Sequence, residues 1–344
     1  MRLVTYVRGA GTSVGVIRAP GPGVYTPETR LGISRGPHPR TVPQHVLDLN
    51  VLAGRDWLTD VGDLLACDGW RAQVQRLVNA AESNIRLGGL DGASAFLRSL
   101  PDLTMCAPVL RPTKVIGVGL NHRSFVEGIG QQIPLHPELF HKTSSALIGS
   151  GTSIQVPAAS RQVVPEGEVA VIIGRAGHDI PEEQAAAHIA GLTCANDLSA
   201  RDLEFRTTQW SSGKMFPTSC PLGPYLVTTD EFPDLDDLRL STLLNGQIIQ
   251  SGSTSDLVFG LSSLISRISQ LTQLEIGDVI LTGTPSDLGA VSDPVFLREG
   301  DVVEVHVEGL GTLRNPVEDR ADQATRSVRL PDTSDHSAQD AHAM

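Results

Sequence analysis

The chain of 344 residues is long enough for one large or two ordinary domains, each with a buried core. Its 27 basic and 39 acidic residues give a net charge of −12, which disfavours nucleic acid and anionic membranes as partners. The four cysteines form no C-x-x-C pair, and the sequence has neither a run of 18 apolar residues nor the apolar stretch of a signal peptide. We therefore expect a cytoplasmic protein with reduced cysteines.

Residues 1–108 are expected to form a smaller α+β domain. The runs RLVTYVR and SVGVIRA are typical of short strands, and a connection rich in Pro and Gly follows them. The pattern of apolar residues predicts helices over residues 45–66 and 70–83, and a further short helix in residues 90–103. No catalytic spacing occurs here. This part is interpreted as an accessory domain that closes over the rest of the chain or takes part in dimerisation.

A second domain is expected over residues 109–319, after a proline-rich boundary. It opens with a strand that leads into residues 122–142, where His, Glu, Gln and Pro occur without periodicity. A segment of this length and composition is typical of a lid or a binding loop. Further along, the patterns predict a hairpin at 238–252 with an Asn245-Gly246 turn and a core helix over 255–271. The segment 275–289 is expected to contain a strand that ends in Thr282-Gly283-Thr284-Pro285, and a twisted hairpin is expected at 299–317. Residues 320–344 lack apolar content and are expected to be a disordered tail.

The stretch from Glu166 to Arg201 has the strongest chemical pattern. Glu166 and Glu168 open the apolar run VAVIIG, and a second apolar run ends at Asn196-Asp197. Alternate residues of a strand face the same side, so the two glutamates converge, and Asp197 joins them if the chain returns beside the first strand. Three carboxylates at one point favour a hard cation, Mg²⁺ or Mn²⁺. The alternative is that E-x-E is only the solvated face of an edge strand.

A series of short motifs resembles the fumarylacetoacetate hydrolase (FAH) family, in family order, from about Lys114 to Val317. The motifs are VGLNHRS, EGEVAVIIG, ANDLSARD, GKMF, CPLGPYLVT, LLNGQIIQ, DVILTGTP and EGDVVEVHVEGLGTLRNPV. The resemblance implies an α+β, β-rich fold in which residues 109–319 form a mixed β-roll or β-sandwich catalytic domain. It also implies a homodimer and a divalent metal, commonly Mg²⁺.

Carried over position by position, the resemblance assigns roles to residues of this chain. The metal ligands fall on Glu166, Glu168 and Asp197. Lys214 is the expected catalytic lysine. Arg201, Lys214 and Thr284 fall on positions that the family uses around the oxo-acid end of the substrate. Lys142 and Gln209 are further candidates for substrate binding.

The chemistry that the resemblance implies is a metal-stabilised enolate formed from a 2-oxo or 2,4-dioxo acid. Hydrolysis of a C–C bond in an acylpyruvate-like substrate is the first expectation. Decarboxylation or isomerisation of a 2-oxo or 2-hydroxymuconate-type diacid is the alternative, and the run LNHRS resembles the isomerase/decarboxylase branch of the family. A non-catalytic or repurposed family member is an alternative of another class.

One departure from the family pattern bears on the reaction. Hydrolytic members carry N-Y-x-x-H-x-x-E, but here Phe125 stands at the histidine position and Gly128 at the glutamate position. Phenylalanine cannot accept a proton, so the usual activation of water is missing. His122 and Glu127, five residues apart, are the candidates to replace this pair.

Overall fold

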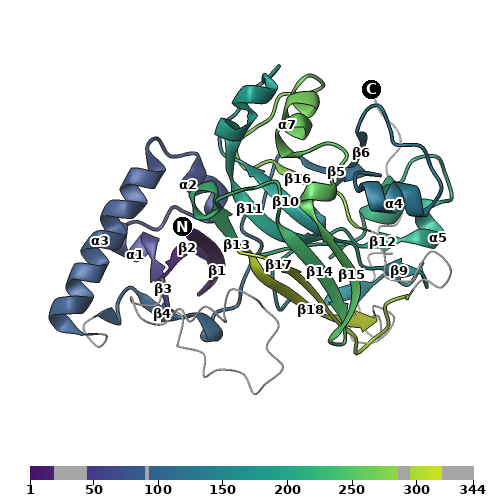
Figure 1. Cartoon of the computed structure of the whole chain (residues 1–344). Coiled ribbons are helices and arrows are strands. Elements are labelled where there is room, and N and C mark those ends of the chain that lie inside the picture. The colour runs from purple at the N-terminus through teal and green to yellow at the C-terminus, as the bar shows by residue number, and fades with distance from the viewer. Residues whose placement is uncertain (19–44, 90–92, 286–294, 320–344) are drawn as a thin grey trace, which may run out of the picture.

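The computed structural model describes residues 1–18, 45–89, 93–285 and 295–319. Most strands of this part belong to one mixed sheet of 11 strands (Figure 1). In spatial order they are β4 (Leu97–Ser99), β3 (His45–Asp48), β2 (Gly11–Ile17), β1 (Arg2–Arg8), β13 (Cys220–Thr228), β11 (Ile189–Asn196), β10 (Gly167–Ile173), β16 (Val279–Leu281), β5 (Val115–Gly119) and β6 (Glu138–Lys142), with β7 (Leu147–Ile148) paired to β13. Since β1 pairs with β13, the sheet crosses the predicted boundary near residue 108, and the division into two domains stays a prediction.

A second sheet of five strands packs against the first. Its order is β15 (Gln247–Ser253), β14 (Arg239–Leu244), β17 (Val302–Val307), β18 (Gly311–Asp319) and β8 (Ile154–Val156), and a small separate sheet joins β12 (Ser199–Ala200) to β9 (Val163–Val164). Val169 and Val171 of β10 share one buried cluster with Val305 of β17 and Leu313 of β18. Ala170 and Ile172, on the other face of β10, belong to a second buried cluster with Leu222 and Leu226 of β13. Both faces of β10 are therefore covered, as its continuous apolar run requires. The predicted α+β, strand-rich fold class is confirmed.

The helices are short, apart from α3. They are α1 (Leu49–Ala53), α2 (Val61–Leu65), α3 (Trp70–Gly88), α4 (Arg123–Gly128), α5 (Arg201–Glu204), α6 (Ser211–Lys214) and α7 (Leu261–Ser269), with 3₁₀ turns η3 (Leu100–Asp102), η4 (Ser144–Ala146), η5 (Glu182–His188), η6 (Thr229–Glu231) and η7 (Thr254–Asp256). Figure 1 shows α1 and α3 beside β1 to β4, on the opposite side of the molecule from α4 and α5. No helix among the described residues is long and apolar enough to cross a membrane.

Several predicted elements are confirmed. The helix expected over residues 70–83 is α3, and the hairpin expected at residues 238–252 is formed by β14 and β15. Asn245 and Gly246 have φ values of 52° and 80°, the left-handed backbone that a tight hairpin turn requires. The hairpin expected at residues 299–317 is formed by β17 and β18.

Other predicted elements are wrong in type or extent. The helix expected over residues 45–66 is strand β3 followed by two five-residue helices, because Asp48 caps α1 and Gly54 ends it with a left-handed backbone. Residues 97–99 form β4 rather than a helix. The helix expected from residue 255 begins at Leu261. The segment 122–142 contains α4 and β6 rather than lacking structure, and the expected tail 320–344 lies outside the described residues.

Candidate metal and substrate site

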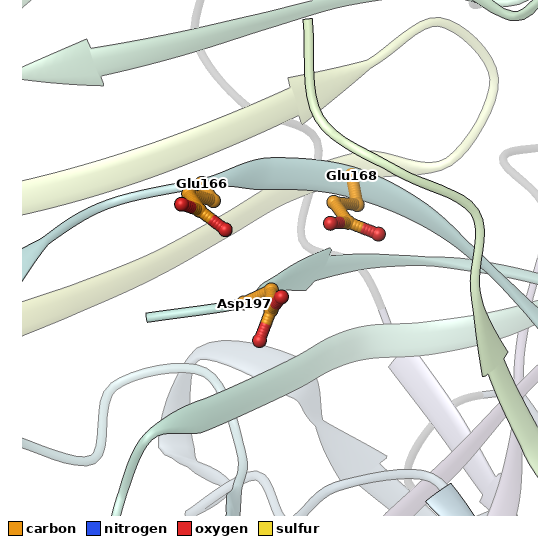
Figure 2. A group of neighbouring side chains, drawn as sticks. All are labelled: Glu166, Glu168 and Asp197. Atoms are coloured by element: carbon orange, nitrogen blue, oxygen red, sulfur yellow. The ribbon is translucent and has the colours of Figure 1, made fainter. Parts of the chain in front are cut away.

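The register of two buried strands brings the three predicted metal ligands together. Strands β10 and β11 pair antiparallel, with Gly167 opposite Asn196. The chain therefore leaves β11 at Asp197 beside Glu166, where the Asp197 N–H donates to the Glu166 carbonyl at 2.8 Å. Figure 2 shows Glu168 on β10 and Glu166 at the start of that strand, with Asp197 beside them where the neighbouring strand β11 ends. The predicted return of the chain beside the first strand is confirmed.

The three carboxylates form a compact, water-excluded cluster. One oxygen from each of Glu166, Glu168 and Asp197 lies within 4.8 Å of the others. The three residues are only 5%, 2% and 1% exposed. A solvated strand face would expose its carboxylates to water, and these three are buried. That alternative is therefore wrong here. Buried charges are costly unless they have partners, so a cluster of this kind requires compensating groups.

Three basic side chains surround the cluster. Lys214 Nζ donates to Glu166 Oε2 at 2.7 Å and to Asp197 Oδ2 at 2.6 Å. Lys142 Nζ donates to Asp197 Oδ1 at 2.6 Å, and Arg201 forms an ion pair with Glu166 Oε1 at 2.6 Å. The structure thus brings the predicted Lys214, Lys142 and Arg201 to the predicted ligands. Lys214 is the last residue of the short helix α6.

The carboxylates differ in electrostatic surroundings. Burial opposes ionisation of Asp197, but Lys142 and Lys214 outweigh it and lower the pKa of this carboxyl. Burial raises the pKa of Glu168 well above its ordinary range, and the charge of Asp197 adds to the rise. The donor to Glu168 among the described residues is the Gly283 N–H, at 2.7 Å. Glu168 thus has no ion-pair partner in the described part of the chain, and a divalent ion among three oxygen ligands would supply one. The residues fit such an ion.

The turn after β16 forms another wall of the site. Besides the Gly283 N–H on Glu168, the Thr284 hydroxyl donates to the Gly167 carbonyl at 3.0 Å. Gln250, which sequence reasoning missed, connects this turn to the start of β10. Its amide donates to Thr284 Oγ1 at 3.0 Å and accepts from the Gly167 N–H at 2.9 Å. The signal in the sequence would have been a glutamine on the hairpin strand beside two apolar residues.

Asn121 holds that turn in position and was also missed. It is 1% exposed, and its amide donates to the Thr282 carbonyl at 2.7 Å and accepts from the Phe259 N–H at 2.8 Å. Gly283 has a φ of +105°, and a Cβ atom there would lie 2.9 Å from Asn121 Cβ. The Asn in VGLN therefore orients the Gly283 N–H toward Glu168. In the sequence, the signal for Asn121 was a side-chain amide two residues after the apolar strand β5.

The two candidates on the segment 122–142, His122 and Glu127, do not form a pair in the structure. His122 is 1% exposed, and its Nδ1 lies 3.5 Å from Asp256 Oδ2, so the acid beside it is Asp256. Burial lowers the pKa of His122, and Asp256 opposes this. Glu127 and Gly128 are exposed on α4, and Phe125 is half-buried. The structure therefore does not bring Glu127 to His122 as a replacement pair.

Two further residues complete the comparison with the predicted site. Gln209 is exposed, so the structure does not gather it with the carboxylates. Glu204, by contrast, is 3% exposed and accepts from Arg201 at 2.8 Å. Burial raises the pKa of Glu204, and the charge of Glu166 adds to the effect. Arg201 is thus held between two buried acids.

Comparison with known proteins identifies the family. The model of the fumarylacetoacetate (FAA) hydrolase C-terminal family matches residues 114–318. The chain belongs to this family. Oxaloacetate tautomerase Fahd2a of Rattus norvegicus is 44% identical over 217 residues, which are 62% of this chain and 69% of that protein. Its Homo sapiens counterpart FAHD2A is 42% identical over 229 residues, 65% of this chain and 73% of that protein.

Solved structures of FAA hydrolase relatives have the same fold. The 5-carboxymethyl-2-hydroxymuconate delta-isomerase of Mycobacterium smegmatis matches with a TM-score of 0.66 and 31% identity, over 93% of this chain and 99% of that one. The fumarylacetoacetate hydrolase of Exiguobacterium antarcticum matches with a TM-score of 0.70 and 28% identity, over 93% of this chain and 100% of that one. The predicted family is confirmed, and the chain is an enzyme of it.

Proposed function

We propose that this FAA hydrolase family enzyme catalyses keto–enol isomerisation of a 2-oxo diacid, with Mg²⁺ or Mn²⁺ held by Glu166, Glu168 and Asp197. The observation that carries the proposal is the contrast between a complete acidic and basic cluster and an α4 segment without a water-activating pair. Isomerisation needs no attacking water. It moves one proton between the carbon next to a carbonyl group and the carbonyl oxygen.

The charges of the site favour an anionic substrate. Four acids (Glu166, Glu168, Asp197 and Glu204) and three bases (Lys142, Lys214 and Arg201) meet at this point among the described residues. With every group charged they sum to about −1, and a divalent cation reverses the sign to about +1. One carboxylate of the substrate then compensates the remaining charge, and Arg201, whose side chain is the most exposed of the three bases, lies at the edge of the cluster where such a group would arrive.

The chemistry divides between the cation and the side chains. A bound divalent ion would act as a Lewis acid on the substrate carbonyl and ease loss of a proton from the adjacent carbon. Lys214 uses two of its three N–H groups on Glu166 and Asp197. Burial lowers the pKa of Lys214, but the two carboxylates outweigh this and raise it, so the ammonium keeps its proton. Its third N–H is available to a substrate oxygen on which negative charge grows.

The relatives support isomerisation over hydrolysis. Proteins of 44% and 42% identity are named oxaloacetate tautomerases, and a structural neighbour at 31% identity is named a delta-isomerase. Hydrolysis of an acylpyruvate-like C–C bond is the second candidate. The neighbour from Exiguobacterium antarcticum, a fumarylacetoacetate hydrolase, favours it. A homodimer and a cytoplasmic location remain predictions.

The test is an assay of oxaloacetate enol disappearance by ultraviolet absorbance, with Mg²⁺ or Mn²⁺ and with excess EDTA. Pyruvate formation is measured in parallel to separate decarboxylation, and an acylpyruvate is assayed for cleavage. We expect enzyme-dependent tautomerisation that EDTA abolishes and that metal restores. Full activity in EDTA would contradict the metal site, and faster acylpyruvate cleavage than tautomerisation would favour the hydrolase.

A further inference from the structure

The Phe140 ring lies beside the ammonium of Lys214. Lys214 Nζ is 4.8 Å from the centre of this ring. Both residues are buried, Lys214 at 3% and Phe140 at 7% exposure. An aromatic face attracts a cation through its quadrupole, and the attraction grows when water is excluded. The contact therefore stabilises the ammonium at this place.

Two glycines of β5 make room for this ring and for a second one. Gly117 pairs with Phe140 across the β5–β6 register, and a Cβ atom at Gly117 would lie 2.1 Å from Phe140 Cζ. A Cβ atom at Gly119 would lie 2.2 Å from Trp210 Cζ3. The two rings meet edge to face, with centroids 5.9 Å apart. Because alternate strand residues share a face, the pattern Gly-Val-Gly leaves one side of β5 to the rings.

The same packing connects the rings to the helix that carries the lysine. Trp210 is the residue directly before α6, and Lys214 is the last residue of α6. Trp210 packs on β5 at one end of this short helix, and Phe140 faces the ammonium at the other. The aromatic pair therefore contacts both the start of the helix that carries Lys214 and the ammonium group of Lys214, and helps to fix the position of both.

An aromatic partner has a specific consequence for hydrogen bonding. Lys214 donates to Glu166 and Asp197, and its third N–H has no acceptor among the residues that the structure describes. A carboxylate, amide or hydroxyl in place of Phe140 would accept this N–H. The ring stabilises the charge and leaves the donor free.

We propose that Phe140 is a positioning residue for Lys214, and that its ring holds the ammonium so that the third N–H remains available to an oxygen of the oxo acid. The inference rests on the role of Lys214 in the proposed function. Phe140 acts through the lysine and needs no contact with the substrate.

A double-mutant cycle tests the contact itself. Denaturant unfolding is measured for the full chain in EDTA, for the wild type, Phe140→Leu, Lys214→Met and the double variant. We expect a coupling that corresponds to roughly a tenfold change in the unfolding equilibrium constant. Additive effects would overturn the proposal, whether or not the enzyme is a tautomerase.

Binding of oxalate, a mimic of the enolate form of a 2-oxo acid, tests the positioning role. For Phe140→Leu we expect the Mn²⁺ affinity to stay within about twofold and the affinity for oxalate with Mn²⁺ to fall roughly tenfold. Phe259→Leu is the matched control, because Phe259 is 8% exposed and lies under Arg267 at 5.0 Å rather than at the carboxylates.

The outcomes separate this inference from the proposed function. Wild-type oxalate affinity in Phe140→Leu, or an equal loss in Phe259→Leu, would overturn the positioning role. Absence of metal-dependent oxalate binding in the wild type would contradict the proposed function instead. The double-mutant cycle would still decide whether Phe140 holds Lys214.

Discussion

The carboxylate cluster and the α4 segment differ in how their acidic residues are held: the acids of the cluster are buried and have partners, whereas the acid on α4 is exposed. Glu166, Glu168 and Asp197 follow from the pairing of two fully buried strands, and each acid is held by backbone or cationic donors. On α4, Glu127 is exposed, and its side chain makes no hydrogen bond or ion pair with the described residues. A strand register leaves little freedom to the buried residues at its end, whereas an exposed helix turn tolerates many side chains. For this enzyme the group that the site binds is therefore easier to infer from the sequence than the reaction that it catalyses.

The largest effect is expected for Asp197→Asn, which should abolish metal binding and turnover and also destabilise the metal-free protein. Asp197 is the acid shared by Lys142 and Lys214, so its loss leaves two buried ammonium groups poorly compensated. Breaking a buried ion pair in this way costs about 3–5 kcal/mol. The measurements are titration calorimetry with Mn²⁺ and denaturant unfolding in EDTA.

Glu168→Gln is the matched variant, with the opposite expectation for stability. The pKa of Glu168 is raised by burial and by Asp197, so its charged form opposes folding of the metal-free protein, increasingly as pH rises above the ordinary range of a glutamate. Glu168→Gln should lose metal binding but unfold in EDTA at neutral pH no more easily than the wild type. Equal destabilisation by both substitutions would contradict the distinction between the two acids.

Lys214→Met is expected to lower kcat/KM for the oxo acid by about 10²–10³-fold, since it removes the donor for the oxygen that gains charge. Metal affinity should be kept or increased, because Glu166 and Asp197 lose a competing cation. Lys114→Met is the control. The Lys114 ammonium is 2.9 Å from the buried Asp278 carboxylate, and this pair is separate from the carboxylate cluster. Steady-state kinetics and Mn²⁺ titration check both variants, and unchanged turnover would exclude Lys214 from the reaction.

Asn121→Ala is expected to weaken both stability and metal binding. It leaves the Phe259 N–H and the Thr282 carbonyl without their partner, at a cost of about 3 kcal/mol. It also frees the Gly283 N–H that holds Glu168. Unfolding and Mn²⁺ titration measure the two effects.

Asn315→Ala separates positioning from packing in that experiment. Asn315 is 2% exposed and donates to the carbonyls of Gly149 and Thr152, so it should cost similar stability without loss of metal affinity. If both variants lose metal affinity equally, the effect of Asn121 is general rather than directed at Glu168.

The smallest effect is expected for Glu127→Gln on α4. An exposed side chain that has no partner in the described part of the chain contributes less than about 0.5 kcal/mol, and isomerisation does not require Glu127 as a base. Turnover should stay within about twofold of the wild type, as for the exposed Glu182→Gln. A loss of about 10²-fold or more, the contribution of a general acid or base, would restore the predicted His122–Glu127 pair and favour hydrolysis.

The amino-acid sequence by itself determined the family, the strand-rich fold class and the three acids, because buried strands, turn residues and acids leave local patterns. Helix α3 and the Asn245-Gly246 hairpin were predictable for the same reason. The helix expected over residues 45–66 was not, since pairing of β3 with β2 overrides its local pattern.

Only the tertiary structure decided which partners meet in the site. Asp256 rather than Glu127 lies beside His122, and Gln209 remains exposed while its neighbour Trp210 packs on Gly119. Gln250, Asn121 and Phe140 reach the site from elements far apart in the chain. Contacts of this kind depend on how sheets and loops pack over long sequence distances, and no local spacing encodes them.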